Sequence, residues 1–285
     1  MQYVVTEHGV GRVESDEVVV LDTVFPNLSA VLEQTGTFAS LSSAPALLRT
    51  PLADATFLRP MGRPRAVWGV GLNYRSKAER AGRSLPTQPI LFLAASSCVL
   101  APGDAVQLPV GVREPDYEGE IAIVIGRPLF HCQPEDVWPA IAGITAANDM
   151  TARDVMRNTA MPVLAKSFPG FTPLGPSVCE LDDLPSRDAI GIRTWVNGVA
   201  VQDDTSAGMI FPVADLISRL SYYAALEPGD VVLTGTPAGT GQDRSVFLEA
   251  GDEVRIEIDG VLPLVTRVFV DDESSIADPA LLAPL

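Results

Sequence analysis

Cysteine, histidine and long apolar runs are all scarce in this chain. Its three cysteines, Cys98, Cys132 and Cys179, are odd in number, far apart and never in a C-x-x-C pair. This spacing predicts neither a disulfide framework nor a zinc site. The only two histidines are His8 and His131, and no Ser-His-Asp set can be assembled around them. No run reaches the roughly 18 apolar residues that a membrane-spanning helix needs.

Positive charge is scarce as well. The 285 residues include 20 Lys and Arg against 36 Asp and Glu, which gives a formal net charge of -16. Such a chain repels nucleic acid and anionic membrane surfaces, so we expect neither as a partner. A cationic or metal-assisted ligand fits better. The N-terminal stretch "MQYVVTEHGVGRVES" has no basic segment followed by a long apolar run, and we therefore expect a cytoplasmic protein.

The order of apolar segments indicates a mixed α/β fold that is predominantly β. Residues 1–60 predict a small β/α subdomain, with a hairpin followed by a short helix at "LSAVLEQTG". In residues 61–285, short apolar strands alternate with Asn-Gly, Asp-Gly and Pro-Gly-Asp turns, which favours a mostly antiparallel β domain. Apolar spacing predicts a helix over residues 213–225, and a second helix is expected near "PEDVWPAIA".

The stretch "EPDYEGEIAIVIG", residues 114–126, joins alternating carboxylates to a strand of Ile and Val. Side chains alternate along a strand, so Asp116, Glu118 and Glu120 share one face. The Cα atoms of Glu118 and Glu120 would lie about 6.6 Å apart, which lets both carboxylates reach one cation. A hard divalent ion, Mg²⁺, Mn²⁺ or Ca²⁺, would relieve their repulsion. The alternative is a half-exposed strand whose carboxylates point into water.

Three further segments place polar side chains beside apolar ones. In "ITAANDMTARD", Asp149 ends a strand and Arg153 follows four residues later, although Asp149 could instead cap a helix. Lys166 interrupts an apolar segment rich in Pro and Gly, "LAKSFPGFTPLGP". The strand in "VVLTGTPAGTG" runs into a loop of small residues that contains Thr236. This loop lacks the Gly-Lys-Ser/Thr of a phosphate-binding loop, so we reject a nucleotide site.

Taken together, these segments resemble the fumarylacetoacetate hydrolase family, in its small-subunit branch. The resemblance covers roughly residues 65–270 and rests on stretches that follow the family's order: "GVGLNYRSKAE", "DYEGEIAIVIGRP", "GITAANDMTARD", "AKSFPGFTPLGP", "GMIFPVADLI" and "LEPGDVVLTGTPAGTG". It implies a layered β-sheet fold with a β-roll-like core, a homodimer and a divalent metal, commonly Mg²⁺.

The resemblance also implies roles for individual residues. The three metal-binding carboxylates of the family fall on Glu118, Glu120 and Asp149. Its substrate-contacting side chains fall on Arg153, Lys166 and Thr236.

This chain departs from the family in the segment "LNYRSKAER". Family hydrolases and decarboxylases often carry L-N-Y-x-x-H-x-x-E, whose histidine and glutamate handle the proton of a water molecule. Here Lys77 stands at the histidine position and Arg80 at the glutamate position. A lysine is protonated at neutral pH unless it is strongly desolvated, so it is a poor base for activating water. Hydrolysis by the usual route is therefore disfavoured.

These features predict a divalent-metal-dependent enzyme that acts on a small 2-oxo or β-dicarbonyl acid through a stabilised enolate. A tautomerase or isomerase, or a decarboxylase, agrees with the missing His-Glu pair. Arg153 and Lys166 would hold the anionic end of the substrate, and Thr236 would donate a hydroxyl. Lys166 is the first candidate for catalysis, and Lys77 is a second candidate for moving a proton.

Two alternatives stay open at this point. One is a C–C bond hydrolase of the acylpyruvate or fumarylacetoacetate type, with water activated by the metal and a ligating glutamate. The other is a catalytically inactive, metal-binding relative that serves as a scaffold or dimer partner. Burial of Lys77 inside a pocket would favour an altered enzyme, and exposure of Lys77 would favour the inactive protein.

Overall fold

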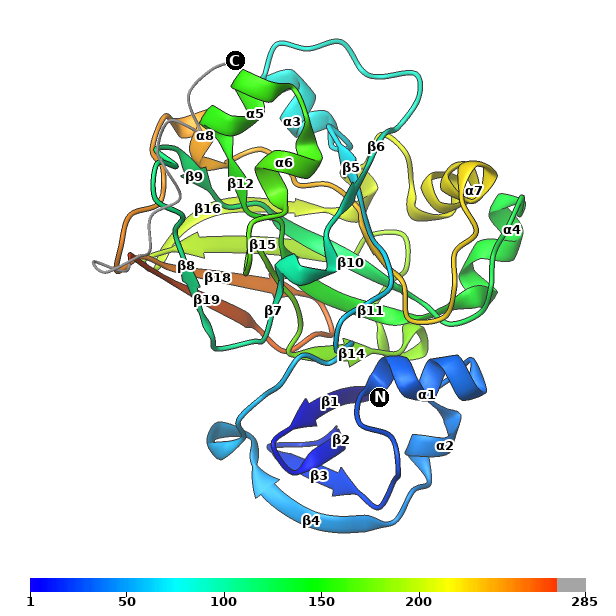
Figure 1. Cartoon of the computed structure of the whole chain (residues 1–285). Helices are drawn as coiled ribbons and strands as arrows, with labels where there is room; N and C mark the ends of the chain where they lie inside the picture. Colours follow the sequence, from blue (N-terminus) through cyan, green and yellow to red (C-terminus); the bar gives the residue numbers. More distant parts are fainter. Residues whose placement is uncertain (271–285) are drawn as a thin grey trace.

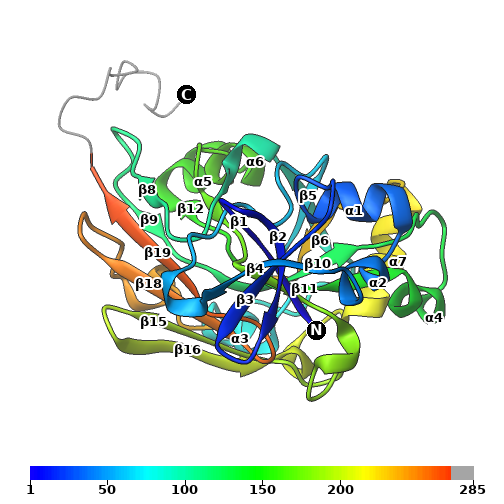
Figure 2. The same ribbon diagram turned by 90° about the horizontal axis from the view of Figure 1, so that it is seen from below.

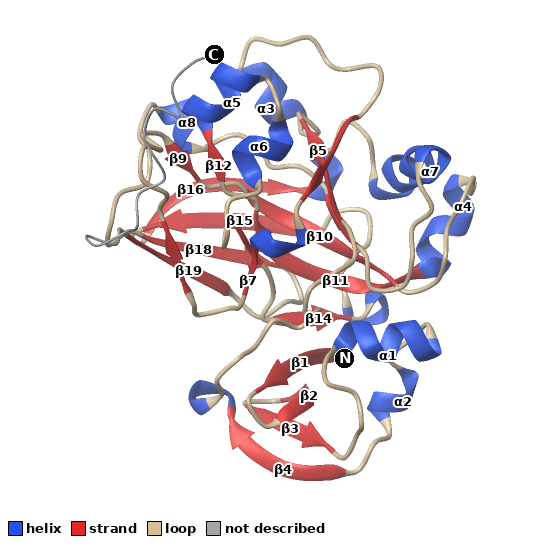
Figure 3. Ribbon diagram, viewed as in Figure 1, coloured by secondary structure: helices blue, strands red, loops and turns tan. Residues whose placement is uncertain are grey.

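The structure is a computed structural model that describes residues 1–270. Two large β-sheets form its body, and short helices gather at their ends (Figures 1 and 3). The larger sheet has ten strands, in the order β4 (Ala46–Pro51), β3 (Glu17–Leu21), β2 (Gly9–Glu14), β1 (Gln2–Thr6), β14 (Ser177–Cys179), β11 (Ile141–Asn148), β10 (Gly119–Ile125), β17 (Val231–Leu233), β5 (Val67–Gly71) and β6 (Ile90–Ala94).

The second sheet has five strands, in the order β16 (Val199–Thr205), β15 (Gly191–Val196), β18 (Glu253–Ile258), β19 (Leu264–Phe269) and β8 (Ala105–Gln107). Two small ladders pair β12 (Thr151–Ala152) with β9 (Pro115–Asp116), and β13 (Thr172–Pro173) with β7 (Val99–Leu100). Most strand pairs are antiparallel, while β17 with β5, β13 with β7 and β19 with β8 are parallel. The predicted mixed α/β, predominantly β and layered fold is confirmed.

The helices are short and lie outside the sheets. They are α1 (Leu28–Thr35), α2 (Ala39–Ser42), α3 (Arg75–Arg80), α4 (Pro134–Val137), α5 (Arg153–Thr159), α6 (Pro162–Lys166), α7 (Val213–Tyr223) and α8 (Gly241–Arg244). The helix expected over residues 213–225 is confirmed as α7, whose buried positions repeat at helical spacing. Within residues 1–270, no helix is long and apolar enough to cross a membrane.

The first four strands extend the larger sheet. β1 pairs antiparallel with β14 through Gln2↔Cys179 and Tyr3↔Val178, so residues 2–51 continue the strand order that also contains β10 and β11. In Figure 1 these strands, with α1 and α2, lie below β14, and Figure 2 views them from below. The boundary near residue 60 between a small N-terminal subdomain and a catalytic domain stays a prediction.

Strand β10 is the buried centre of the molecule. Its Ile121 and Ile123 belong to the core cluster shared with the five-stranded sheet, and Ala122 and Val124 belong to the cluster shared with β1–β3 and α1. Each large aliphatic side chain buried in this way contributes about 1.5–3 kcal/mol to stability. Because side chains alternate along a strand, Glu120 continues the face of Ala122 and Val124. A well-packed strand therefore holds the backbone from which this carboxylate projects.

Candidate functional site

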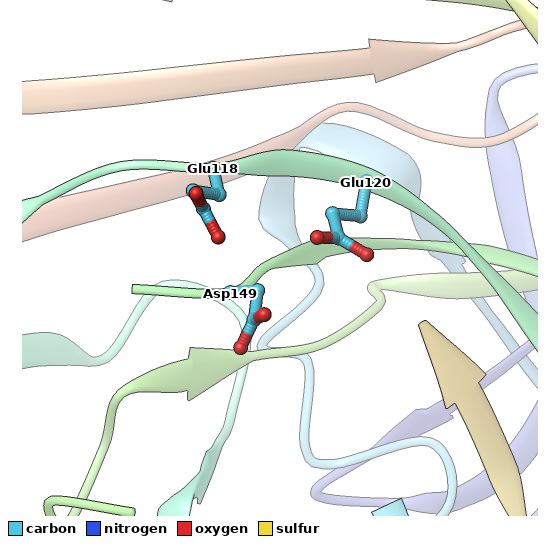
Figure 4. A group of neighbouring side chains, drawn as sticks. All are labelled: Glu118, Glu120 and Asp149. Atoms are coloured by element: carbon cyan, nitrogen blue, oxygen red, sulfur yellow. The ribbon is translucent and has the colours of Figure 1, made fainter. Parts of the chain in front are cut away.

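Three carboxylates converge where β10 and β11 meet. Gly119 of β10 pairs with Asn148 of β11, so Glu118 and Asp149, the next residues outward, lie opposite each other. Glu120 projects from β10 and Glu118 directly precedes this strand, and Figure 4 shows the three side chains grouped together. One ligand oxygen from each residue lies within 4.8 Å of the others.

Burial decides between the two interpretations of this strand. The relative exposure is 7% for Glu118, 2% for Glu120 and 1% for Asp149. The alternative in which these carboxylates point into water is therefore wrong. Asp149 does not cap a helix either, because the N-cap residue of α5 is Ala152.

Two buried cations close the carboxylate cluster. Lys166, the last residue of α6, donates from Nζ to Glu118 Oε2 at 2.6 Å and to Asp149 Oδ2 at 2.5 Å. Arg153, the first residue of α5, donates from Nη2 to Glu118 Oε1 at 2.5 Å. Both oxygens of Glu118 are thus fixed by cations. Lys166 also donates to Thr151 Oγ1 at 2.7 Å and lies 5.3 Å from the centre of the Phe92 ring.

The three carboxylates differ in their proton affinity because their neighbours differ. Burial would raise the pKa of Glu118, but Arg153 and Lys166 outweigh it and hold this pKa well below its usual range. Burial, with Asp149 and Glu118 nearby, raises the pKa of Glu120 well above its usual range. Burial also raises the pKa of Asp149 to about 6, even though Lys166 acts in the opposite direction. With all of its carboxylates ionised, the cluster would therefore hold more negative charge than its two cations neutralise.

A count of charges shows what the cluster can accept. Four buried carboxylates face two buried cations: Asp116, Glu118, Glu120 and Asp149 against Arg153 and Lys166. When all four carboxylates are ionised, four minus two leaves a formal deficit of two positive charges. Asp149 Oδ1 is buried and has no hydrogen-bond partner among the residues that the structure describes, although buried polar atoms normally have one. An all-oxygen donor set of this charge fits a hard divalent cation.

The cluster lines a cavity of about 480 Å³. The cavity also brings Arg153, Lys166, Thr236 and Lys77 together, so every predicted site residue contributes to its wall. The hydroxyl of Thr236 donates to the Gly119 carbonyl at 2.8 Å and accepts from Gln202 at 2.8 Å. A substrate hydrogen bond donated by Thr236 would have to replace the one to Gly119.

Lys77 and Arg80 hold α3 against α8 on another part of the cavity wall. Lys77 is only 7% exposed, and its Nζ donates to Thr240 Oγ1 at 2.6 Å and to Asp243 Oδ2 at 2.9 Å. Arg80 donates to the backbone carbonyl of Asp243 at 2.9 Å. The two positions that differ from the family pattern therefore hold one ion pair and one hydrogen bond to the backbone, and neither supplies an imidazole. Neither His8 nor His131 lines this cavity.

Sequence reasoning missed two carboxylates of the cavity region. Strand alternation puts Asp116 on the acidic face, but its contact with Arg153 could not be predicted, because this contact depends on the pairing of β9 with β12. Asp243 follows a stretch of small residues in the sequence and lies in α8, and in the sequence only the spacing Thr240-x-x-Asp243 marks it. The structure shows this spacing as a capping box at the start of α8.

Comparisons with known proteins agree with this fold. Residues 66–269 match the family model described as "Fumarylacetoacetate (FAA) hydrolase C-terminal". The oxaloacetate tautomerase Fahd2a, mitochondrial, of Rattus norvegicus is 40% identical over 221 residues, which cover 76% of this chain and 71% of that protein.

Two solved structures show the likeness in three dimensions. The 5-carboxymethyl-2-hydroxymuconate delta-isomerase of Mycobacterium smegmatis has a TM-score of 0.77 at 27% identity, covering 95% of this chain and 100% of that one. A fumarylacetoacetate hydrolase of Exiguobacterium antarcticum has a TM-score of 0.83 at 28% identity, with the same coverage. Since the family model matches well over half of the chain, this protein is an enzyme of the fumarylacetoacetate hydrolase family.

Proposed function

We propose that this enzyme is a divalent-metal-dependent enol–keto tautomerase that acts on a small 2-oxo or dicarbonyl acid. The observation that carries the proposal is the composition of one cavity. It joins three buried carboxylates to the cations Arg153 and Lys166, and no histidine within residues 1–270 lines it. The names of the relatives, an oxaloacetate tautomerase and a hydroxymuconate isomerase, support the same class of reaction.

Glu118, Glu120 and Asp149 would hold the metal, for which Mg²⁺, Mn²⁺ and Ca²⁺ all suit carboxylate oxygens. When bound, such an ion supplies Lewis-acid stabilisation of negative charge on an enolate oxygen. The packed strand β10 and the register of β10 with β11 fix where the carboxylates lie. The backbone then needs little reorganisation when the ion and the substrate arrive, and the change required is at Lys166, whose Nζ occupies Glu118 Oε2 and Asp149 Oδ2.

Lys166 would bind the anionic substrate and supply a proton to its carbon, and the proton that leaves the enol oxygen would restore the ammonium. Burial lowers the pKa of a lysine, but Asp149 and Glu118 outweigh this and raise the pKa of Lys166 above its usual value. Its Nζ therefore rests fully protonated at neutral pH, so Lys166 starts the reaction as a proton donor and not as a base. Arg153, held at Nε and Nη2 by two carboxylates, would orient the substrate carboxylate from a fixed position.

Lys77 separates this proposal from the two alternatives. Lys77 is buried in the cavity wall and paired with Asp243, which supports an altered enzyme over an inactive scaffold. Water activation for C–C hydrolysis would need a base at this position, and a lysine bound to a carboxylate and a hydroxyl supplies a poor one. A tautomerase needs no activated water, because the proton moves between oxygen and carbon of one substrate.

An ultraviolet assay of enol decay tests the proposal. Oxaloacetate, acylpyruvates and 2-hydroxymuconate-type acids would be followed with Mg²⁺ or Mn²⁺, while release of pyruvate is measured separately. We expect metal-dependent loss of the enol signal from at least one of these acids without C–C cleavage. Rapid pyruvate release from an acylpyruvate would instead support the hydrolase.

A pair of variants tests the metal ligands. Glu118→Gln should lower turnover by more than about a hundredfold and weaken Mn²⁺ binding measured by calorimetry. The matched control is Glu114→Gln, since Glu114 lies nearby in the sequence, is half-buried and pairs with Arg157 outside the carboxylate cluster. The catalytic proposal fails if no substrate turns over with either metal, or if Glu118→Gln behaves like Glu114→Gln.

A further inference from the structure

Asp116 is a fully buried carboxylate, with a relative exposure of 0%. Its Oδ2 accepts hydrogen bonds from Arg153 Nε at 2.7 Å and from the Gln242 backbone amide at 3.0 Å. Its Oδ1 accepts from the backbone amides of Gly241, at 2.6 Å, and Tyr117, at 2.8 Å. Four donors from three separate segments of the chain thus meet one carboxylate.

Local geometry explains why these segments can meet. The pairing of β9 with β12 places Asp116 beside Thr151, and Arg153 begins α5 directly after β12. On the other side, Gly241 has no side chain, and a Cβ atom there would lie 2.6 Å from Asp116 Oδ1. Glycine at this position therefore permits the close approach of α8 to the carboxylate.

The contacts of Asp116 extend to both functional parts of the cavity. Through Arg153 they reach Glu118, whose Oε1 accepts from Arg153 Nη2. Through the first turn of α8 they reach Asp243, whose Oδ2 accepts from Lys77. A guanidinium with two carboxylate partners is fixed in direction as well as in place.

We propose that Asp116 is a positioning residue, which sets the direction of Arg153 and the place of α8 and so orients the metal ligand Glu118 and the Lys77 wall. This inference rests on the proposed function, because it assigns Asp116 to the site that binds the metal and the substrate. Mutation of a residue that orients a metal ligand typically lowers metal affinity by about tenfold to a hundredfold.

Asp116→Asn is the direct test. Both oxygens of Asp116 accept from two donors, so either orientation of an asparagine turns its NH₂ group toward N–H donors. We expect the dissociation constant for Mn²⁺ alone, measured by calorimetry, to rise by about tenfold or more. In the enol-decay assay, KM should rise by a larger factor than kcat falls, because Arg153 holds the substrate.

Asp230→Asn is the matched control. Asp230 is 3% exposed and accepts from the backbone amides of Ala66 and Glu227, but it does not line the cavity. Its variant should lose thermal stability while the Mn²⁺ dissociation constant and KM stay within about twofold of the parent. The inference is overturned if Asp116→Asn shows the same pattern as Asp230→Asn.

A second variant covers the case in which Asp116→Asn does not fold. Arg153→Lys leaves the three backbone hydrogen bonds of Asp116 in place but cannot contact Asp116 and Glu118 with one planar fork. It should reproduce the weaker Mn²⁺ binding, and parental affinity in this variant would contradict the inference. If the parent protein itself neither binds Mn²⁺ nor turns over an enol, the proposed function fails instead.

Discussion

Replacement of Lys166 by methionine removes the ammonium that bridges two buried carboxylates. Lys166 neutralises Glu118 and Asp149 at once, and methionine keeps most of the side-chain volume. Removing one partner of a buried ion pair costs about 3–5 kcal/mol, because the other charge stays buried without compensation. For a protein of this size each kcal/mol changes the melting temperature by about 2–4 °C. The metal-free variant should therefore melt on the order of 10 °C lower than the parent.

The same substitution should strengthen metal binding. In the parent, Lys166 Nζ occupies Glu118 Oε2 and Asp149 Oδ2, which are oxygens that the metal would use. Removal of this competing cation should tighten the Mn²⁺ dissociation constant by about tenfold, and each tenfold adds about 1.4 kcal/mol of stabilisation at a fixed excess of metal. Added Mn²⁺ should thus raise the melting temperature of Lys166→Met by several degrees more than that of the parent.

Differential scanning calorimetry with and without Mn²⁺ measures both effects, and the enol-decay assay should show loss of turnover despite tighter metal binding. Lys77→Met is the control, because Lys77 is also buried and paired, but with Asp243 outside the cluster. Its metal-free protein should melt lower too, with a smaller change in the Mn²⁺-induced shift. The reasoning is refuted if Mn²⁺ raises the melting temperature of Lys166→Met no more than that of the parent.

Three other expectations can be checked quickly. Lys77→His combined with Arg80→Glu restores the residue types of the family hydrolases, so pyruvate release from an acylpyruvate should appear; an unchanged product pattern contradicts the role given to these positions. Burial raises the thiol pKa of Cys98 and Cys179 to about 11, so a thiol reagent at about pH 8 should label half-buried Cys132 first. Mass spectrometry measures the labelling, and equal labelling of the three cysteines would contradict this expectation. Light scattering should give the mass of a homodimer, twice 30.3 kDa, and a monomer mass contradicts that expectation.

The elements that were predictable from the sequence are those with a strong local pattern. Apolar spacing located α7, and alternation located β10 together with the shared face of its isoleucines. Helices α5 and α6 have only 7 and 5 residues, too few for a clear helical period. The pairing of β1 with β14 joins segments far apart in the chain, and no short window of sequence records such a pairing.

The carboxylate cluster was partly predictable for the same reason. Strand alternation alone puts Glu118 and Glu120 on one face, but only the register of β10 with β11 puts Asp149 opposite them. The sequence shows Lys166 as a lysine in an apolar segment, but it does not show which two carboxylates Lys166 contacts. Those partners, Glu118 and Asp149, directly flank β10 and β11, whereas Lys166 ends the short helix α6, which the sequence pattern did not predict.

The charge of the cavity explains how a strongly acidic protein can attract an acid. The chain as a whole carries a formal charge of -16 and repels anions at long range. The cavity reverses this sign, because six cations and four carboxylates line it: Lys77, Arg80, Arg83, Arg153, Arg157 and Lys166 against Glu118, Glu120, Asp149 and Asp243. A divalent cation held by the cluster would add two further positive charges. Fields of this kind are focused inside a cleft and screened outside it, so an anionic substrate that reaches the cavity mouth is drawn toward the cluster.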